Sequence, residues 1–232
     1  LDLTKVDKDR VQVNLIPPTI TSETIVYNMP KIVPGTYSIY DFGQYVDDFQ
    51  AFDIQGNLLT VNRLDVNRWE IETAKALRKV TYWVEDTWDA EMAPSEFVFE
   101  PAGTNIEEGE NMVLNNHGFF GYFDGYKHNK YQITIFRPEK FYASTGLNSF
   151  KTEGDMDQFT TLSYMDLVDA PIMYSIPDTT SFQVGGTEIL ISVYSKNKMT
   201  SAEDLTLDIK QVVTQQKDYL GASLTVKKYA FI

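Results

Sequence analysis

The sequence has 232 residues and a formal net charge of −13, from 20 Lys and Arg residues against 33 Asp and Glu residues. Hydrophobic residues make up 43% and aromatic residues 13% of the chain, which is typical of a globular protein with a large core and excludes a disordered chain. Cysteine is absent, which excludes disulfides and thiolate catalysis, and no apolar run approaches the roughly 18 residues needed to cross a bilayer.

The charge balance also argues against a nucleic-acid partner. Nucleic-acid binding normally needs a basic patch that displaces the counterions of the phosphates. The basic groups here are short and isolated, at residues 127–130 and at Lys227 and Lys228. We therefore predict no nucleic-acid binding and interpret the acidic excess as a contribution to solubility.

Strand-like segments dominate the first 165 residues. Residues 11–15 and 131–135 alternate apolar and polar side chains with a period of two, as half-buried strands do. β-branched and aromatic residues are enriched in four more segments, at 24–29, 49–53, 68–73 and 80–85. Turn residues separate these segments, whereas the polar, acidic residues 101–109 are predicted to be a solvated loop. The pattern predicts a mainly β fold built as an antiparallel β-sandwich.

The pattern changes after Ser163. Ser163 and Asp166 predict a short capped turn, because a serine hydroxyl can accept a backbone N–H at the start of a helical turn. Residues 182–184 and 187–194 predict a hairpin around the Gly-Gly pair between them.

One long helix is predicted at residues 201–220, followed by a strand at 226–232. Thr200 and Glu203 have the spacing of a capping box, and Gly221 supplies a stop. Hairpin, helix and strand together form a small α+β segment that is too small for an independent core. We therefore expect an unsatisfied apolar face on the helix.

Residues 29–43 are the most informative stretch of the sequence. They read Met-Pro-Lys-Ile-Val-Pro-Gly-Thr-Tyr-Ser-Ile-Tyr-Asp-Phe-Gly, and Pro30 and Pro34 must end the preceding strand because they lack a backbone N–H. The string resembles a corner in the N-terminal domain of the glycyl aminopeptidase family, zinc metallopeptidases of the gluzincin type. Ile32 is a departure, since the family has a tryptophan there.

Four further segments resemble the same family in the same order. They are Asp53-Ile54-Gln55-Gly56-Asn57 with Trp69, then Tyr82-Trp83-Val84, then residues 111–122, and finally Tyr164-Met165-Asp166-Leu167-Val168-Asp169-Ala170-Pro171-Ile172. The resemblance covers nearly the whole chain, but only the front portion of a family member.

The resemblance implies an N-terminal β-sandwich at residues 1–163 and the start of a thermolysin-like catalytic domain, truncated, at 164–232. The parent would be a zinc-dependent aminopeptidase with a PDZ domain further on, and its partners would be its own downstream catalytic domain and a peptide substrate. The resemblance and the missing initiator Met favour an exported protein. In this expectation the chain itself is not catalytic, and it supports the catalytic domain and walls one side of the substrate cleft.

The zinc motif of gluzincins is absent from the sequence. That motif, His-Glu-x-x-His, places two imidazoles on one helix face and a general base between them. The two histidines, His117 and His128, begin no such motif, and both are predicted to lie in loops and form hydrogen bonds. Ser195 and Lys198 match Ser-x-x-Lys but sit in a polar turn without the companion motifs. We therefore assign no catalytic, cofactor-binding or metal-binding residue to this chain.

Three acidic groups have the composition of a Ca²⁺ site or an acid–base pair. They are Asp47 and Asp48, then Glu107, Glu108 and Glu110, and then Asp86, Asp89 and Glu91. Among 33 acidic residues such groups arise by chance, so we interpret them as solvated surface.

The alternative function is a free-standing carbohydrate- or peptide-binding β-sandwich module. Its sequence support is aromatic: Trp83, Trp88 and the aromatic residues of 119–126 have the composition of a stacking platform or a peptide-binding edge. Trp69 and Trp83 are predicted to be core residues and Trp88 to be exposed. Tyr37 and Asp41, beside the Pro-Gly corner, fit either a substrate contact or fold maintenance.

Overall fold

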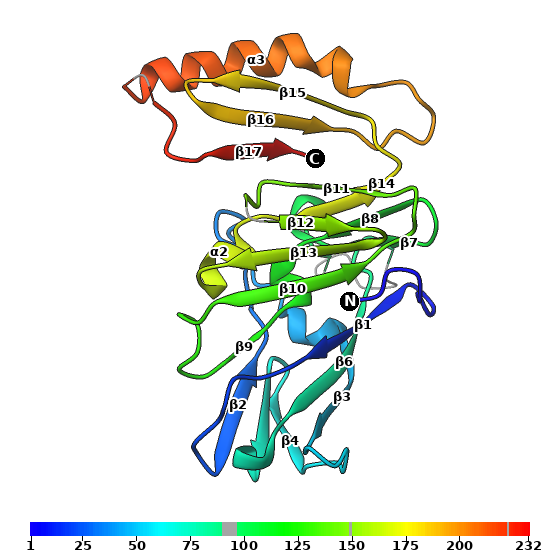
Figure 1. Cartoon of the computed structure of the whole chain (residues 1–232), viewed down its shortest axis with the longest axis vertical. Helices are drawn as coiled ribbons and strands as arrows, with labels where there is room; N and C mark the ends of the chain where they lie inside the picture. Colours follow the sequence, from blue (N-terminus) through cyan, green and yellow to red (C-terminus); the bar gives the residue numbers. More distant parts are fainter. Residues whose placement is uncertain (90–96, 149, 222) are drawn as a thin grey trace.

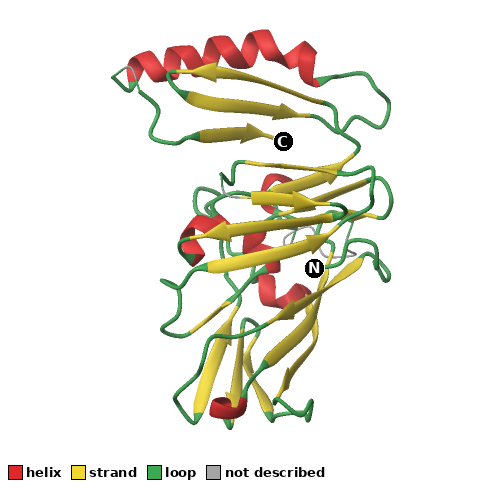
Figure 2. Cartoon of the chain, in the orientation of Figure 1, coloured by secondary structure: helices red, strands yellow, loops and turns green. Residues whose placement is uncertain are grey.

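A computed structural model describes residues 1–89, 97–148, 150–221 and 223–232 (Figure 1). Three tiers follow one another along the longest axis of the molecule. Two tiers consist of β-sheets, and the third carries a long helix across a small sheet (Figure 2). The described residues thus have a mainly β fold with one long helix near the C-terminal end, as predicted.

The first tier contains two antiparallel sheets. In spatial order, one sheet contains β1 (Arg10–Leu15), β6 (Lys79–Glu85) and β3 (Val46–Phe52). The other contains β4 (Val61–Asp65), β5 (Arg68–Glu72), β2 (Thr24–Asn28) and β9 (Tyr122–Phe123). Short 3₁₀ helices occur at Phe42–Tyr45, Ala74–Ala76 and Glu100–Ala102.

Aromatic side chains fill the space between these two sheets. The ring of Phe49 on β3 stacks on Trp69 of β5 with 4.9 Å between centroids. Tyr27 on β2 and Tyr82 on β6 approach each other with 5.8 Å between centroids. Contacts of this kind between opposite sheets are the core of a sandwich, which confirms the predicted architecture.

The second tier also pairs two antiparallel sheets. One contains β10 (Tyr131–Phe136), β13 (Met156–Thr161) and β12 (Phe150–Glu153). The other contains β11 (Tyr142–Thr145), β14 (Ile172–Ser175), β8 (Asn111–Leu114) and β7 (Asn105–Glu107). The short helices α1 (Asn116–Phe119) and α2 (Tyr164–Val168) lie in connections beside them.

A buried ion pair lies between the sheets of the second tier. Arg137 Nε lies 3.0 Å from Asp157 Oδ2, and the hydroxyls of Tyr174 and Thr152 donate to the same carboxylate at 3.1 and 2.6 Å. Removing one member of such a group leaves a buried charge uncompensated, which is strongly destabilising.

The third tier has a small hydrophobic cluster separate from the main core, whereas the sequence predicted that this segment is too small for a core of its own. The helix α3 (Ala202–Tyr219) packs on β15 (Thr179–Val184) and β16 (Thr187–Ser192), and β17 (Lys228–Phe231) pairs with β16 in parallel. Val184, Ile189 and Val213 are the buried members of this hydrophobic cluster. The predicted hairpin, helix and strand are therefore confirmed.

The ends of α3 correct one prediction and confirm another. The capping box is formed by Ser201 and Asp204, one residue later than predicted, because Ser201 Oγ accepts the backbone N–H of Asp204 at 3.2 Å. Gly221 follows the helix with a φ of +90°, as the predicted stop requires. Leu207 and Tyr219 are exposed on α3, at 76% and 90%.

The predicted solvated loop at 101–109 is wrong. Ala102, Thr104 and Ile106 are buried, and β7 begins inside the segment. The polar backbone of this segment can be buried because it finds hydrogen-bond partners. The N–H of Thr104, for example, donates to Thr87 Oγ1 at 2.8 Å.

The predicted domain boundary between residues 163 and 164 stays a prediction. The predicted capped turn is confirmed as α2, where Ser163 accepts the N–H of Asp166 at 3.2 Å. Leu167 on α2 and Tyr174 on β14 belong to the main hydrophobic core, and β14 pairs with β8 and β11.

Candidate functional site

The corner at residues 30–42 has a fixed base. Lys31 O accepts the N–H groups of Tyr40 and Asp41 at 2.7 and 3.0 Å, and Asp41 Oδ1 accepts from Asn67 Nδ2 at 2.7 Å. Asn67 Oδ1 in turn accepts the N–H of Gly43 at 3.0 Å. Asp41 therefore maintains the fold of the corner.

The tip of the same corner exposes apolar side chains. Ile32, Tyr37 and Ile39 are 48%, 101% and 72% exposed. Tyr37 has a φ of +58°, a left-handed conformation that is uncommon for a bulky residue and costs of the order of 1–3 kcal/mol. A loop that has a hydrogen-bonded base and exposes apolar side chains at its tip is a candidate interaction surface.

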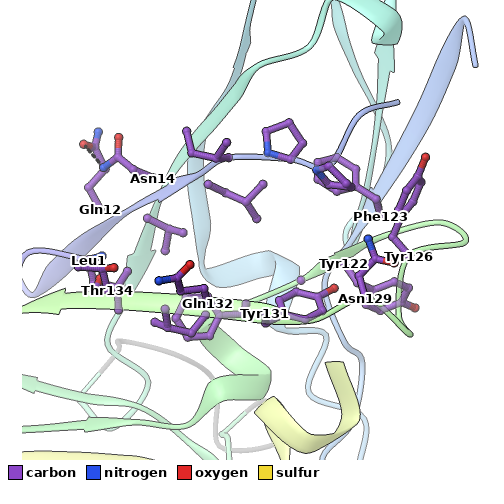
Figure 3. Close-up of a pocket in the computed structure, with 18 of the residues that line it drawn as sticks. Leu1, Gln12, Asn14, Tyr122, Phe123, Tyr126, Asn129, Tyr131, Gln132 and Thr134 are labelled. Carbon is purple, nitrogen blue, oxygen red and sulfur yellow. Dashed lines mark hydrogen bonds between the residues drawn. The ribbon is translucent and has the colours of Figure 1, made fainter. Parts of the chain in front are cut away.

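A groove of about 920 Å³ opens between β1 and β10 (Figure 3). Gln12 and Asn14 of β1 lie on one side and Gln132 and Thr134 of β10 on the other, while Tyr126 lies at one end. The sequence did not predict any of these four polar residues as part of a site. The two strands that carry them are more than a hundred residues apart, so no local pattern places them together.

The predicted aromatic group contributes to this groove. Phe120, Tyr122, Phe123 and Tyr126 line it, and so does Trp83, which is half-buried. The prediction that Trp83 is a core residue is therefore wrong. Trp69 and Trp88 are 3% and 45% exposed, as predicted.

Three buried tyrosines fix the floor of the groove. Tyr82 Oη donates to Phe119 O at 2.8 Å, Tyr27 Oη accepts the N–H of Gly121 at 2.9 Å, and the two hydroxyls are 2.8 Å apart. Tyr164 Oη donates to the next carbonyl, Phe120 O, at 2.7 Å.

Ionisation does not disturb these hydrogen bonds near neutral pH. Burial raises the pKa values of Tyr27, Tyr82 and Tyr164 above that of a free tyrosine. At the groove edge, burial raises the pKa of Tyr131 to about 12. All four hydroxyls are therefore neutral and can donate.

The two histidines lie in different environments. His128 is an exposed residue of a turn, as predicted. His117 lies in α1 with 7% exposure, so its predicted loop position is wrong. Burial lowers the pKa of His117, and its Nδ1 has no hydrogen-bond partner among the described residues.

The acidic groups are engaged in local contacts. Asp47 Oδ2 lies 3.4 Å from Arg10, and Asp48 Oδ1 accepts from Gln50 at 2.8 Å. Asp86 is buried, so its predicted position on the solvated surface is wrong. Its carboxylate accepts the N–H groups of Trp88 and Ile106, and burial raises its pKa.

Glu107 and Glu110 connect the second and third tiers. Glu107 pairs with Lys196, which lies between Ser195 and Lys198 of the Ser-x-x-Lys match, and Tyr194 Oη donates to Glu110 at 3.2 Å. Among the described residues, neither Asp89 nor Glu108 belongs to a group of side chains that could hold a metal ion, and Glu91 lies outside those residues.

The described residues do not fit a zinc ion. They contain no group of three or more His, Cys, Asp or Glu side chains that could hold a metal. In the described ranges, no helix combines the length and apolarity needed to span a bilayer.

The family described as Peptidase M61 N-terminal domain matches residues 1–176. A search of curated protein sequences finds no match. Among solved structures, an aminopeptidase N family protein from Idiomarina loihiensis is 18% identical, with a TM-score of 0.84 over 100% of this chain and 38% of that chain.

Two further structures are more distant. Aminopeptidase A from Legionella pneumophila, in complex with aspartic acid, is 12% identical, with a TM-score of 0.50 over 99% of this chain and 27% of that chain. An M1 zinc metallopeptidase from Deinococcus radiodurans is 12% identical, with a TM-score of 0.43 over 95% of this chain and 50% of that chain. This chain therefore spans half or less of each of these structures.

The family match covers the corner, both sheets that face each other across the aromatic core, and β14. The similarity to the Idiomarina protein shows that the fold of the whole chain recurs in a longer protein. This chain therefore belongs to the Peptidase M61 N-terminal domain family.

Proposed function

We propose that this chain is the non-catalytic N-terminal part of a larger zinc-dependent aminopeptidase. In that protein it supports the downstream catalytic domain and forms one wall of the cleft that receives the peptide. The family match over residues 1–176 carries the proposal. We further propose that the full protein is exported from the cytoplasm, which cell fractionation tests.

The exposed tip of the corner is the surface that we assign to the catalytic domain. Ile32, Tyr37 and Ile39 project from a loop whose base is fixed by hydrogen bonds. Burying one large apolar side chain contributes about 1.5–3 kcal/mol, so even one residue of this tip is a measurable part of a domain contact.

The test compares two isoleucines with equal exposure. Ile39 and Ile54 are both 72% exposed, but Ile54 lies in the turn beside Asp53, away from the corner. We expect Ile39→Ser to weaken association between this chain and the separately produced remainder of the protein at least fivefold, with Ile54→Ser unchanged. Equal effects of the two substitutions, measured by calorimetry, would refute the assignment of the tip.

A second experiment addresses the non-catalytic role itself. The isolated chain should neither hydrolyse aminoacyl anilides nor retain zinc in a one-to-one ratio after dialysis. Turnover that co-purifies with the chain and persists in independent preparations would contradict the proposal.

A further inference from the structure

Two edge strands face each other across the groove. Among the described residues, β1 pairs with β6 alone and β10 pairs with β13 alone, so each strand has one edge outside a ladder. Such an edge offers a row of N–H and C=O groups that can direct the pairing of another strand.

One end of the β10 edge already has a short parallel partner. The N–H of Phe136 donates to Leu1 O at 3.0 Å, Phe136 O accepts from Leu3 at 2.8 Å, and the nitrogen of Leu1 donates to Thr134 O at 2.8 Å. Backbone groups of a strand point to the same side every second residue. The backbone of Gln132 therefore faces the groove in continuation of this pairing.

The flanking side chains define what a strand in the groove must look like. Val13 on β1 and Ile133 on β10 are buried, whereas their neighbours Asn14 and Gln132 are exposed. The ring of Phe120 adds apolar surface on the inner side. A strand with the same pleat must therefore place apolar side chains inward and polar side chains outward at alternate positions.

We propose that the groove is an acceptor site for an extended peptide, which adds as a strand parallel to β10 and antiparallel to β1. Figure 3 shows that β1 and β10 run in opposite directions, so one inserted strand meets both requirements. Each flanking strand has six residues, and Leu1 and Leu3 already pair with one end of β10, so the bound segment pairs over at most about six residues. The added strand joins the two sheets into one, a known mode of peptide recognition. This site is separate from the corner tip and goes beyond the proposed function.

The probe is a fluorescein-labelled peptide of six alternating Thr and Val residues. We expect saturable binding by fluorescence anisotropy, together with at least tenfold slower hydrogen exchange of the Gln132 and Thr134 amides. The matched control has three Val residues followed by three Thr residues, and it should bind at least tenfold more weakly. N-methylation at alternate positions removes backbone donors without any change in the protein, and it should reduce binding to a similar extent.

A fusion variant tests the geometry without added peptide. The six alternating residues are placed directly ahead of Leu1, whose nitrogen already faces Thr134. This extension should occupy the groove and weaken binding of the free peptide at least tenfold. Unchanged binding by the fusion, or equal binding of the N-methylated peptide, overturns the proposal. The proposal is also overturned if the peptide does not bind at millimolar concentration. It is likewise overturned if the Gln132 and Thr134 amides are protected only by self-association of the chain and not by the peptide.

Discussion

Tyr27 and Tyr82 are expected to act as one hydrogen-bonding unit in the sandwich core. Because Tyr82 Oη donates to Phe119 O, its oxygen is the acceptor for the Tyr27 hydroxyl, which itself accepts from Gly121. Tyr27→Phe leaves one buried group unpaired, the N–H of Gly121. Tyr82→Phe leaves two, the carbonyl of Phe119 and the hydroxyl of Tyr27.

Counting unpaired groups gives the magnitudes. Each buried unsatisfied group costs about 1–3 kcal/mol, so Tyr82→Phe should lower the free energy of unfolding about twice as much as Tyr27→Phe. The double variant leaves only the N–H of Gly121 and the carbonyl of Phe119 unpaired. Its loss should therefore equal that of Tyr82→Phe, with a coupling energy of about 1–3 kcal/mol.

Urea unfolding followed by circular dichroism measures the four free energies of this cycle. Tyr219→Phe is the control, since Tyr219 is 90% exposed and its hydroxyl should contribute nothing measurable. Losses that add within about 0.5 kcal/mol would show that the two hydroxyls act independently. A larger loss for Tyr27→Phe than for Tyr82→Phe would refute the assigned donor and acceptor.

Three further predictions concern single residues. Gly121→Ala should prevent stable folding, because a Cβ there would lie 2.2 Å from a backbone oxygen of β2, whereas Gly146→Ala, with 3.9 Å to its nearest neighbour, should have little effect on the melting temperature. Burial lowers the pKa of His117 below its ordinary 6.5, so the stability it contributes is complete above pH 6.5 and is lost as the pH falls through its folded-state pKa. His117→Gln should flatten the pH dependence of the unfolding free energy in that range, and an unchanged slope would exclude His117 as the cause. Ser201→Ala should cost about 1 kcal/mol of stability and Thr200→Ala almost none, and the reverse order in urea unfolding would contradict the observed capping box.

The sequence patterns predicted where the strands and helices of this fold lie along the chain. They did not predict as well which of these elements lie next to one another in space. The strict alternation in β1 and β10 identifies both strands and their buried faces, because the period of two follows from strand geometry alone. The parallel contact of Leu1 and Leu3 with Phe136 joins residues more than a hundred positions apart, and no local signal encodes it. Because one end of the groove is formed by this contact, the groove could not be predicted from the sequence.

The adjacent aromatics Tyr82 and Trp83 show why the role of Trp83 was mispredicted. Neighbouring residues of a strand point to opposite faces, so only one of the two can face the sandwich core. Tyrosine and tryptophan both have a strong preference for strands, so the residue types do not determine which of the two faces the core. The structure buries Tyr82, whose hydroxyl has partners, and leaves Trp83 on the groove side.

The corner and the groove floor are attached to the same strand. Tyr27 on β2 accepts the N–H of Gly121 in the floor, and the corner begins directly after β2, where the N–H of Met29 donates to Asn67 O at 2.9 Å. A core substitution at Tyr27 would therefore disturb both surfaces at once and could not assign a function to either. Substitution of Ile39 changes the corner alone, and N-methylation of the peptide changes the groove contact alone. A loss of domain association without a loss of peptide binding, or the reverse, would then show that the two surfaces act separately.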